Sequence, residues 1–147
     1  MKISIQEISG REEDEIIFKC HLVDDNILQL IHRIKSTSNA IIGMDGDKIH
    51  KLSLNDILYF ETVDNKSFLY CKNNVYETKL KLYEFEEITA GTHFFRGSKS
   101  IVLNSDRIEF IKPALSGRFE VSMENGEKVM VSRQFVPDLK KMLGVGA

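Results

Sequence analysis

The sequence predicts a mostly β fold of the α+β class, in which antiparallel strands are combined with short helices. Three observations lead to this prediction. Many short segments alternate polar and apolar residues, turn-forming residues such as Asn125-Gly126 separate them, and few segments carry apolar residues at helical spacing. A chain of 147 residues, 42% of them hydrophobic, is also long enough to bury a core without a metal or a disulfide framework.

Residues 1–45 are predicted to form a strand–strand–helix extension. Residues 2–6 alternate polar and apolar side chains, and residues 16–23 are rich in β-branched and apolar side chains, so both segments favour strands. Two aspartates and an asparagine come next, before apolar residues at helical spacing, which predicts a capped amphipathic helix over residues 25–36. The role of the extension is left open between dimerisation, covering a sheet and regulation by a partner.

Residues 46–147 are predicted to form the main β unit. Its strands are expected at residues 48–54, 57–62, 67–72, 75–79, 100–103, 107–112, 118–123 and 127–131. A short helix is expected at residues 81–88. Ser132 is expected to cap a final helix that ends at Gly144, because a glycine there stops the helical spacing of the apolar residues.

No motif in the chain predicts catalysis, a cofactor or a metal site. The four histidines are scattered, and the metalloprotease, nucleophile-elbow, phosphate-loop and dinucleotide-binding patterns are all missing from the sequence. Cys20 and Cys71 lie far apart, which argues against a zinc site and a disulfide framework. Since a long apolar run and a signal peptide are also missing, we expect a cytoplasmic protein with two reduced, buried thiols and no cofactor.

The charged residues are distributed unevenly along the chain. The formal net charge is −2, which by itself gives no sign of a nucleic-acid partner. Residues 1–47 contain five basic and nine acidic residues, whereas residues 96–118 contain five basic and two acidic residues. A protein that contacts DNA through a few loops needs only local positive potential, so residues 96–118 are a candidate for the DNA-facing region.

Three polar loops at strand ends carry side chains that suit nucleic acid. Lysine and arginine donate to phosphate oxygens and to guanine, and asparagine and glutamine pair with adenine. Each loop taken alone also fits an ordinary solvated turn, and Arg96 could either contact a phosphate or orient its loop. The candidate DNA-binding residues are Asn65, Lys66 and Ser67 in the first loop, Arg96, Ser98, Lys99 and Ser100 in the second, and Ser132, Arg133 and Gln134 in the third.

The order of the motifs around these loops resembles that of LytTR-type DNA-binding domains. The block around the second loop is the most specific part, and the resemblance covers about residues 45–145, or two thirds of the chain. The matching motifs are Ile57-Leu58-Tyr59-Phe60-Glu61 before the first loop, Phe94-Phe95-Arg96 with Ser100 and Asn104 at the family's spacing, and Val131-Ser132-Arg133.

The resemblance implies an elongated set of small antiparallel sheets that contacts the major grooves of DNA with loops in place of a recognition helix. It also implies base contacts at Ser67, Lys99 and Arg133. Arg133 matches the family's usual residue, whereas relatives often have histidine or arginine in place of Ser67 and asparagine or arginine in place of Lys99. These departures leave the recognised DNA sequence open, and Asn65 or Lys66 could take over the first contact.

The function that the resemblance implies is that of a sequence-specific transcriptional regulator that binds double-stranded DNA. The extension is too short for a phospho-receiver domain, so the chain is similar to the stand-alone bacterial regulators of this family. Such a protein is expected to act as a homodimer on direct-repeat half-sites, and a membrane protein is a further possible partner. The alternative is a protein- or ligand-binding β module that does not bind DNA.

Overall fold

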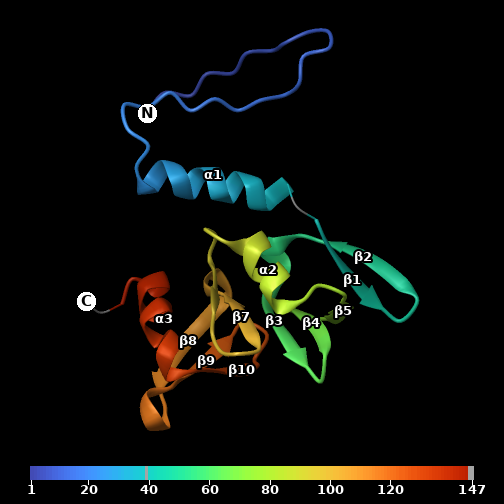
Figure 1. Cartoon of the computed structure of the whole chain (residues 1–147), viewed down its shortest axis with the longest axis vertical. Coiled ribbons are helices and arrows are strands. Elements are labelled where there is room, and N and C mark those ends of the chain that lie inside the picture. Colours follow the sequence, from blue (N-terminus) through green and yellow to red (C-terminus); the bar gives the residue numbers. More distant parts are fainter. Residues whose placement is uncertain (39, 146–147) are drawn as a thin grey trace.

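Two antiparallel sheets and three α-helices make up the regular structure of residues 1–38 and 40–145, which the computed structural model describes (Figure 1). The larger sheet has seven strands in the order β2-β1-β5-β4-β3-β7-β6, and the smaller sheet has three in the order β10-β9-β8. All strand pairs are antiparallel in the part of the chain described. The prediction of a mostly β, antiparallel α+β fold is therefore confirmed.

After residue 46 the elements follow the predicted ranges closely, except that β6 was not among the predicted strands. The strands of the larger sheet are β1 (Ile41–Asp45), β2 (Lys48–Leu52), β3 (Ile57–Val63), β4 (Lys66–Cys71), β5 (Val75–Thr78), β6 (Phe94–Arg96) and β7 (Ile101–Asn104). The strands of the smaller sheet are β8 (Ile108–Pro113), β9 (Phe119–Met123) and β10 (Lys128–Val131). The helices are α1 (Asp25–Ser38), α2 (Leu82–Thr89) and α3 (Val136–Leu143).

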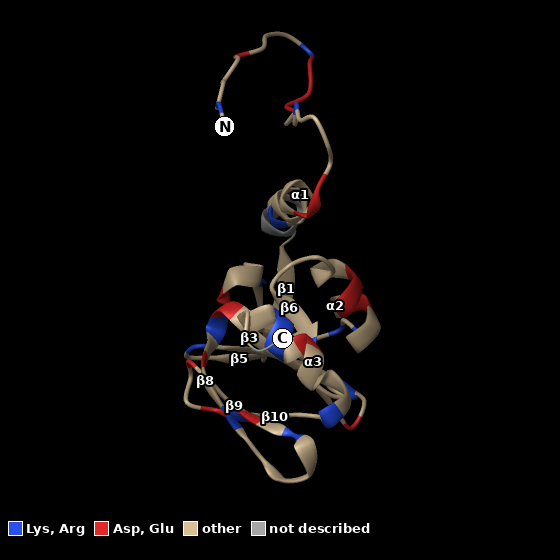
Figure 2. Cartoon of the chain, turned by 90° about the vertical axis from the view of Figure 1, so that its left-hand side faces the viewer, with Lys and Arg blue, Asp and Glu red and all other residues tan. Residues whose placement is uncertain are grey.

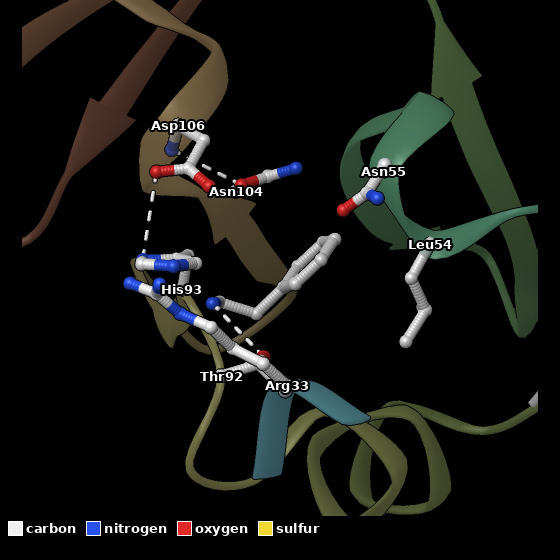
Figure 3. Close-up of a pocket in the computed structure, with 8 residues that line it drawn as sticks. Arg33, Leu54, Asn55, Thr92, His93, Asn104 and Asp106 are labelled. Carbon is white, nitrogen blue, oxygen red and sulfur yellow. Dashed lines mark hydrogen bonds and ion pairs between the residues drawn. The ribbon is translucent and has the colours of Figure 1, made fainter. Parts of the chain in front are cut away.

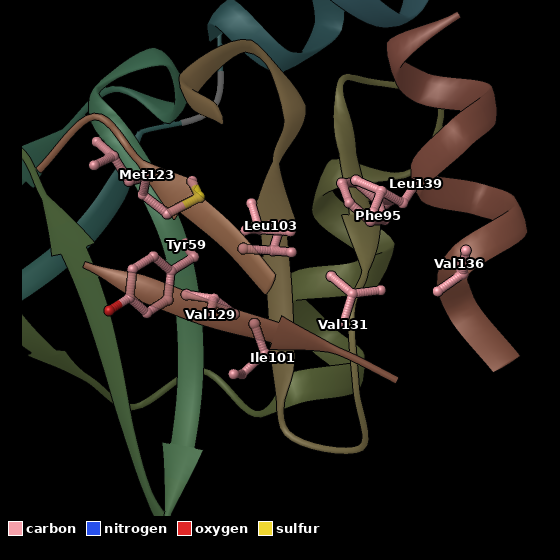
Figure 4. Packing of buried hydrophobic residues seen from close by; sticks show 11 residues of the cluster. Tyr59, Phe95, Ile101, Leu103, Met123, Val129, Val131, Val136 and Leu139 are labelled. Carbon is pink, nitrogen blue, oxygen red and sulfur yellow. The ribbon is translucent and has the colours of Figure 1, made fainter. Parts of the chain in front are cut away.

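A hydrophobic core lies on each face of the seven-stranded sheet, because successive side chains of a strand point to opposite faces. Tyr59 of β3 faces the smaller sheet and α3, where it shares a core with Leu103 and Leu139 (Figure 4). Its neighbour Phe60 faces α2, and its ring stacks on that of Phe85 with centroids 4.7 Å apart. The two sheets are thereby held in a fixed relation, which also fixes the loops at their ends.

Two tight hairpin turns set the register of the strands. The predicted turn at Asn125-Gly126 joins β9 to β10, and the Gly126 N–H donates to the carbonyl oxygen of Met123 at 2.9 Å. Between β3 and β4, Asp64 and Asn65 form a two-residue turn with φ values of 50° and 64°, as a type I′ turn requires. The polar loop expected between these strands is therefore only two residues long.

The two strands expected at residues 2–6 and 16–23 are not formed. Residues 1–24 contain no strand, and their apolar side chains are exposed, Ile5 to 90%. Strand-forming residues are stable as strands only when a neighbouring strand satisfies their backbone groups, and this segment has none beside it. Cys20 lies in the segment and is exposed, contrary to expectation, whereas Cys71 is half-buried on β4.

The predicted helix of the extension is present as α1. The Ile27 N–H donates to Oδ1 of Asp24 at 3.0 Å, which is the expected N-terminal cap. Figure 1 shows α1 lying across one end of the sheets, with residues 1–24 extending beyond it. Strand β1 follows and was not expected, so the larger sheet begins before the boundary predicted at residue 46.

The last helix begins later than expected. Ser132 makes no side-chain cap, and residues 133–135 form a single 3₁₀ turn in which the Phe135 N–H donates to the Ser132 carbonyl oxygen at 2.9 Å. Helix α3 starts at Val136, with a proline in its first turn, and ends at Gly144, whose φ of 68° is the predicted left-handed stop. No helix in the described ranges is long and apolar enough to cross a membrane.

Candidate nucleic-acid interface

The three predicted polar loops lie at one end of the molecule and are joined by backbone hydrogen bonds. The Thr62 N–H, near the end of β3, donates to the carbonyl oxygen of Ser100 at 2.9 Å. The Ser132 N–H, just after β10, donates to the carbonyl oxygen of Gly97, also at 2.9 Å. The loop over residues 97–100 therefore stands between the other two, and the three form one continuous surface.

Arg96 shapes the central loop from within. Its Nε donates to the carbonyl oxygen of Ser98 at 2.6 Å, and one terminal nitrogen donates to that of Lys99 at 2.8 Å. The other terminal nitrogen forms an ion pair with Glu86 of α2 at 2.6 Å. Because its guanidinium is engaged on all three nitrogens, Arg96 orients the loop, which is one of the two roles that the sequence left open.

The backbone of the central loop packs against the hydrophobic core. Gly97 is buried, and a Cβ atom at this position would lie 2.9 Å from Cδ1 of Leu103 and 3.6 Å from Cγ2 of Val131. A side chain would therefore push the loop off the core. Without a side chain at Gly97, the loop packs closely against the core, and this packing fixes the direction in which the Lys99 side chain points.

The candidate residues differ in how accessible their side chains are. Asn65, Lys66, Lys99, Arg133 and Gln134 are exposed, and Ser98, Ser100 and Ser132 are half-buried. Ser67 is only 8% exposed, because the short turn places it inside β4, where it pairs with Thr62 on one side and Thr78 on the other. The base contact expected at Ser67 therefore has no accessible side chain to make it.

The loop end carries four cationic side chains that form no ion pair with any described residue: Lys66, Lys99, Arg118 and Arg133. The four loops that hold them contain one carboxylate, Asp64. Among the other cations, Arg107 pairs with Glu124 and Lys112 with Glu120, whereas exposed lysines such as Lys51 and Lys72 also form no ion pair with a described residue. Figure 2 shows acidic residues on the N-terminal segment and on α2, where Glu86 lies beside the central loop as the partner of Arg96. The loop end thus has a local excess of positive charge, four cations against one carboxylate in these loops.

One element of this end lies in the candidate region over residues 96–118 but holds none of the ten candidate DNA-binding residues. The loop over residues 114–118, between β8 and β9, reaches the third predicted loop, because Gly117 lies directly under the side chain of Arg133. It also presents Arg118 and an exposed Leu115. Nothing in the sequence indicates that this loop contacts Arg133.

A cavity of about 350 Å³ lies at the opposite end of the sheet, beneath α1 (Figure 3). Arg33 of α1 faces it, together with His93 and Asp106, whose Nδ1 and Oδ1 atoms are 3.5 Å apart. Asn104, which also lines the cavity, is fixed in place because it donates to the Ile57 carbonyl oxygen and accepts from the Asp106 N–H. No three histidine, cysteine or acidic side chains gather as a metal site in the described part of the chain.

Comparisons with known proteins agree with the fold and identify its family. The family model described as the LytTr DNA-binding domain matches residues 47–144. The solved LytTr DNA-binding domain of a Bacillus cereus protein, described as a methyl-accepting/DNA response regulator, superposes with a TM-score of 0.67 and 28% identity, over 71% of this chain and 96% of that one.

Curated relatives match the chain over its whole length. Proteins named as uncharacterized HTH-type transcriptional regulators, from Staphylococcus aureus strains NCTC 8325 and MRSA252, are each 23% identical over 147 residues, which is 99% of both chains. Their names specify a helix–turn–helix, but no two α-helices in residues 1–38 and 40–145 of this chain are joined by a short turn. At the cationic end the accessible groups are carried by loops.

Proposed function

Because this chain belongs to the family of LytTR DNA-binding domains, we propose that it is a sequence-specific transcriptional regulator that contacts the major grooves of double-stranded DNA with loops. The observation that carries the proposal is the convergence of four cations without ion-pair partners among the described residues on loops held together by backbone hydrogen bonds. The names of its full-length relatives support a role in transcription.

The roles of the side chains follow from their accessibility and chemistry. Lys99 and Arg133 are long, exposed donors, and both suit the O6 and N7 atoms of guanine. Asn65 lies in the β3–β4 turn and Lys66 directly after it, where they would contact phosphates or take the first base contact in place of Ser67. Ser98, Ser100, Ser132 and Gln134 surround them as further donors.

We further propose that the protein binds direct-repeat half-sites as a homodimer and does so in the cytoplasm. The resemblance to the family suggests the half-sites and the location, and the homodimer is supported by the exposure of apolar residues in the N-terminal segment, where Ile3, Ile16 and Ile17 are each at least 65% exposed. Several exposed β-branched side chains in one segment would be covered if a second copy packed against it. The segment lies beyond α1, so a second copy bound there would leave the loop end free for DNA (Figure 1).

The alternative function is that of a protein- or ligand-binding module without DNA binding. The cavity beneath α1 favours it in part, since it brings Arg33, His93 and Asn104 together around a space that a small ligand could occupy. A ligand-binding module needs no cations at the other end, however. Binding of DNA that weakens as salt rises would decide in favour of the regulator, because phosphate contacts release counterions.

Selection of binding sites from random duplex DNA by the full chain tests the proposal. We expect enrichment of a repeated motif whose two copies share one orientation. The variant Arg133→Ala, which removes one proposed base contact, is expected to lose the enrichment at one position of each copy. Failure of the parent to enrich any sequence, with the chain folded, would contradict a sequence-specific regulator.

A further inference from the structure

The loop between β8 and β9 has a closed, well-defined shape. The Ala114 N–H donates to the carbonyl oxygen of Arg118 at 2.9 Å, and Nε of Arg118 donates back to that of Leu115 at 3.0 Å. Ser116 and Gly117 both have left-handed backbones, with φ values of 63° and 74°. These bonds hold the loop in one conformation, so the surface that it presents to its neighbour is also fixed.

That neighbour is the side chain of Arg133. A Cβ atom at Gly117 would lie 2.8 Å from Cδ of Arg133, closer than non-bonded carbon atoms approach, and 3.0 Å from its Cγ, which is tighter than most such contacts. The aliphatic part of Arg133 therefore lies directly on the backbone of Gly117. An exposed arginine would otherwise sample many rotamers, and a guanidinium makes two parallel bonds to guanine only in one narrow geometry.

We infer that the β8–β9 loop is a fourth element of the DNA interface, in which Gly117 is a positioning residue that sets the direction of Arg133. The inference rests on the proposed function, because it requires Arg133 to contact a base. A side chain at Gly117 displaces the Cγ and Cδ atoms of Arg133 and turns its guanidinium away from the base edge. The loop thus contributes to base discrimination although its own glycine makes no bond to DNA.

A glycine with positive φ can also be required only because the turn needs that backbone conformation. Gly126 serves as the control for this alternative. Gly126 has a φ of 85° in the β9–β10 turn, and a Cβ atom there would meet no other atom within 4 Å. Asparagine tolerates the left-handed conformation better than other residues with a side chain. Gly117→Asn and Gly126→Asn therefore impose similar backbone demands, but only the first crowds Arg133.

The experiment measures the affinity of the full chain for its selected duplex and for the same duplex with one altered base pair. We expect Gly117→Asn to weaken binding to the selected duplex at least about fivefold and to lose discrimination at the position that Arg133→Ala affects. This corresponds to about 1 kcal/mol, the lower limit for a bidentate base contact. Gly126→Asn should bind and discriminate like the parent, and thermal unfolding of both variants shows whether they are folded.

The double variants decide how the loop acts. In the Arg133→Ala background, Gly117→Asn should cause no further loss, because the side chain that it displaces is gone. A further loss there, or equal binding by Gly117→Asn and Gly126→Asn, would overturn the positioning role. If Arg133→Ala itself binds and discriminates like the parent, the proposed base contact fails, and the inference fails with it.

Discussion

The N–H of Ser132 donates to the carbonyl oxygen of Gly97 at 2.9 Å, joining the corner after β10 to the loop between β6 and β7. Lys99 leaves the surface two residues after Gly97, and Arg133 leaves it one residue after Ser132. The separation of these two cations is therefore set by the backbone. A fixed separation is what recognition of two base pairs at a defined spacing requires.

Replacing Arg96 with methionine should lower both stability and DNA affinity. The change removes two hydrogen bonds to loop carbonyl oxygens and the partly buried pair with Glu86, which together stabilise the fold by about 1–3 kcal/mol. Urea unfolding and DNA titration measure the two effects. Arg107→Met is the matched control, because Arg107 binds a carbonyl oxygen and Glu124 at the opposite end. An affinity loss as large in the control would contradict the role of Arg96.

Ser67 and Lys66 are neighbours in sequence but should respond differently to alanine. Ser67 is buried within β4, so Ser67→Ala should leave DNA affinity unchanged within about twofold. Lys66 is exposed at the turn, and its removal should reduce the slope of log affinity against log salt by about 0.9 if it neutralises one phosphate. Titrations at several salt concentrations measure both. A larger loss of DNA affinity in Ser67→Ala would support the base contact that the sequence predicts at Ser67.

The two cysteines should differ in their reaction with iodoacetamide. Burial, and secondarily the Asp56 carboxylate, raise the pKa of Cys71 to about 11, so little thiolate is present at neutral pH. Cys20 is exposed and should be modified first. Mass spectrometry of timed samples should show the Cys71 rate rising about tenfold per pH unit between pH 7 and 10. Equal rates at pH 7.5 in the folded protein would contradict the burial of Cys71.

The proposed homodimer should depend on the N-terminal segment. Changing Ile16 and Ile17 together to aspartate places two charges on side chains that are 65% and 66% exposed, so the fold should survive while an apolar contact is lost. Light scattering after size exclusion should give twice the monomer mass for the parent and the monomer mass for the variant. Leu115→Ser, which alters a side chain 80% exposed at the loop end, should remain dimeric. A monomeric parent would contradict the proposal.

The local part of the fold was predictable from the sequence. Turn residues and alternation located β3 and the hairpins β4–β5 and β9–β10, and helical spacing located α1 and α2. The errors lie where pairing is decided by distant residues. Residues 2–6 and 16–23 have the composition of strands but no partner, whereas β1 was missed although it pairs with β2 and β5.

The sequence predicted the individual loops of the candidate site, but not that they lie together. The sequence marked the loops that hold Lys99 and Arg133, but their convergence depends on hydrogen bonds between residues far apart in the chain. Ser67 was correctly predicted to lie in a strand, but its burial between two neighbouring strands depends on their pairing and was not visible in the sequence. The contact between the Gly117 backbone and the Arg133 side chain could not be predicted from the sequence, because it depends on the lack of a side chain at Gly117.

The central claim is that Lys99 and Arg133 contact bases of a specific duplex, and fluorescence anisotropy with the selected duplex tests it most directly. Alanine at either position should weaken binding by about 5- to 150-fold, the range of 1–3 kcal/mol for a bidentate base contact. Lys72→Ala removes an exposed cation at the other end of β4 and should change affinity less than about threefold. If both loop variants bind as tightly as the parent, or the parent binds scrambled and selected duplexes equally, the claim is wrong.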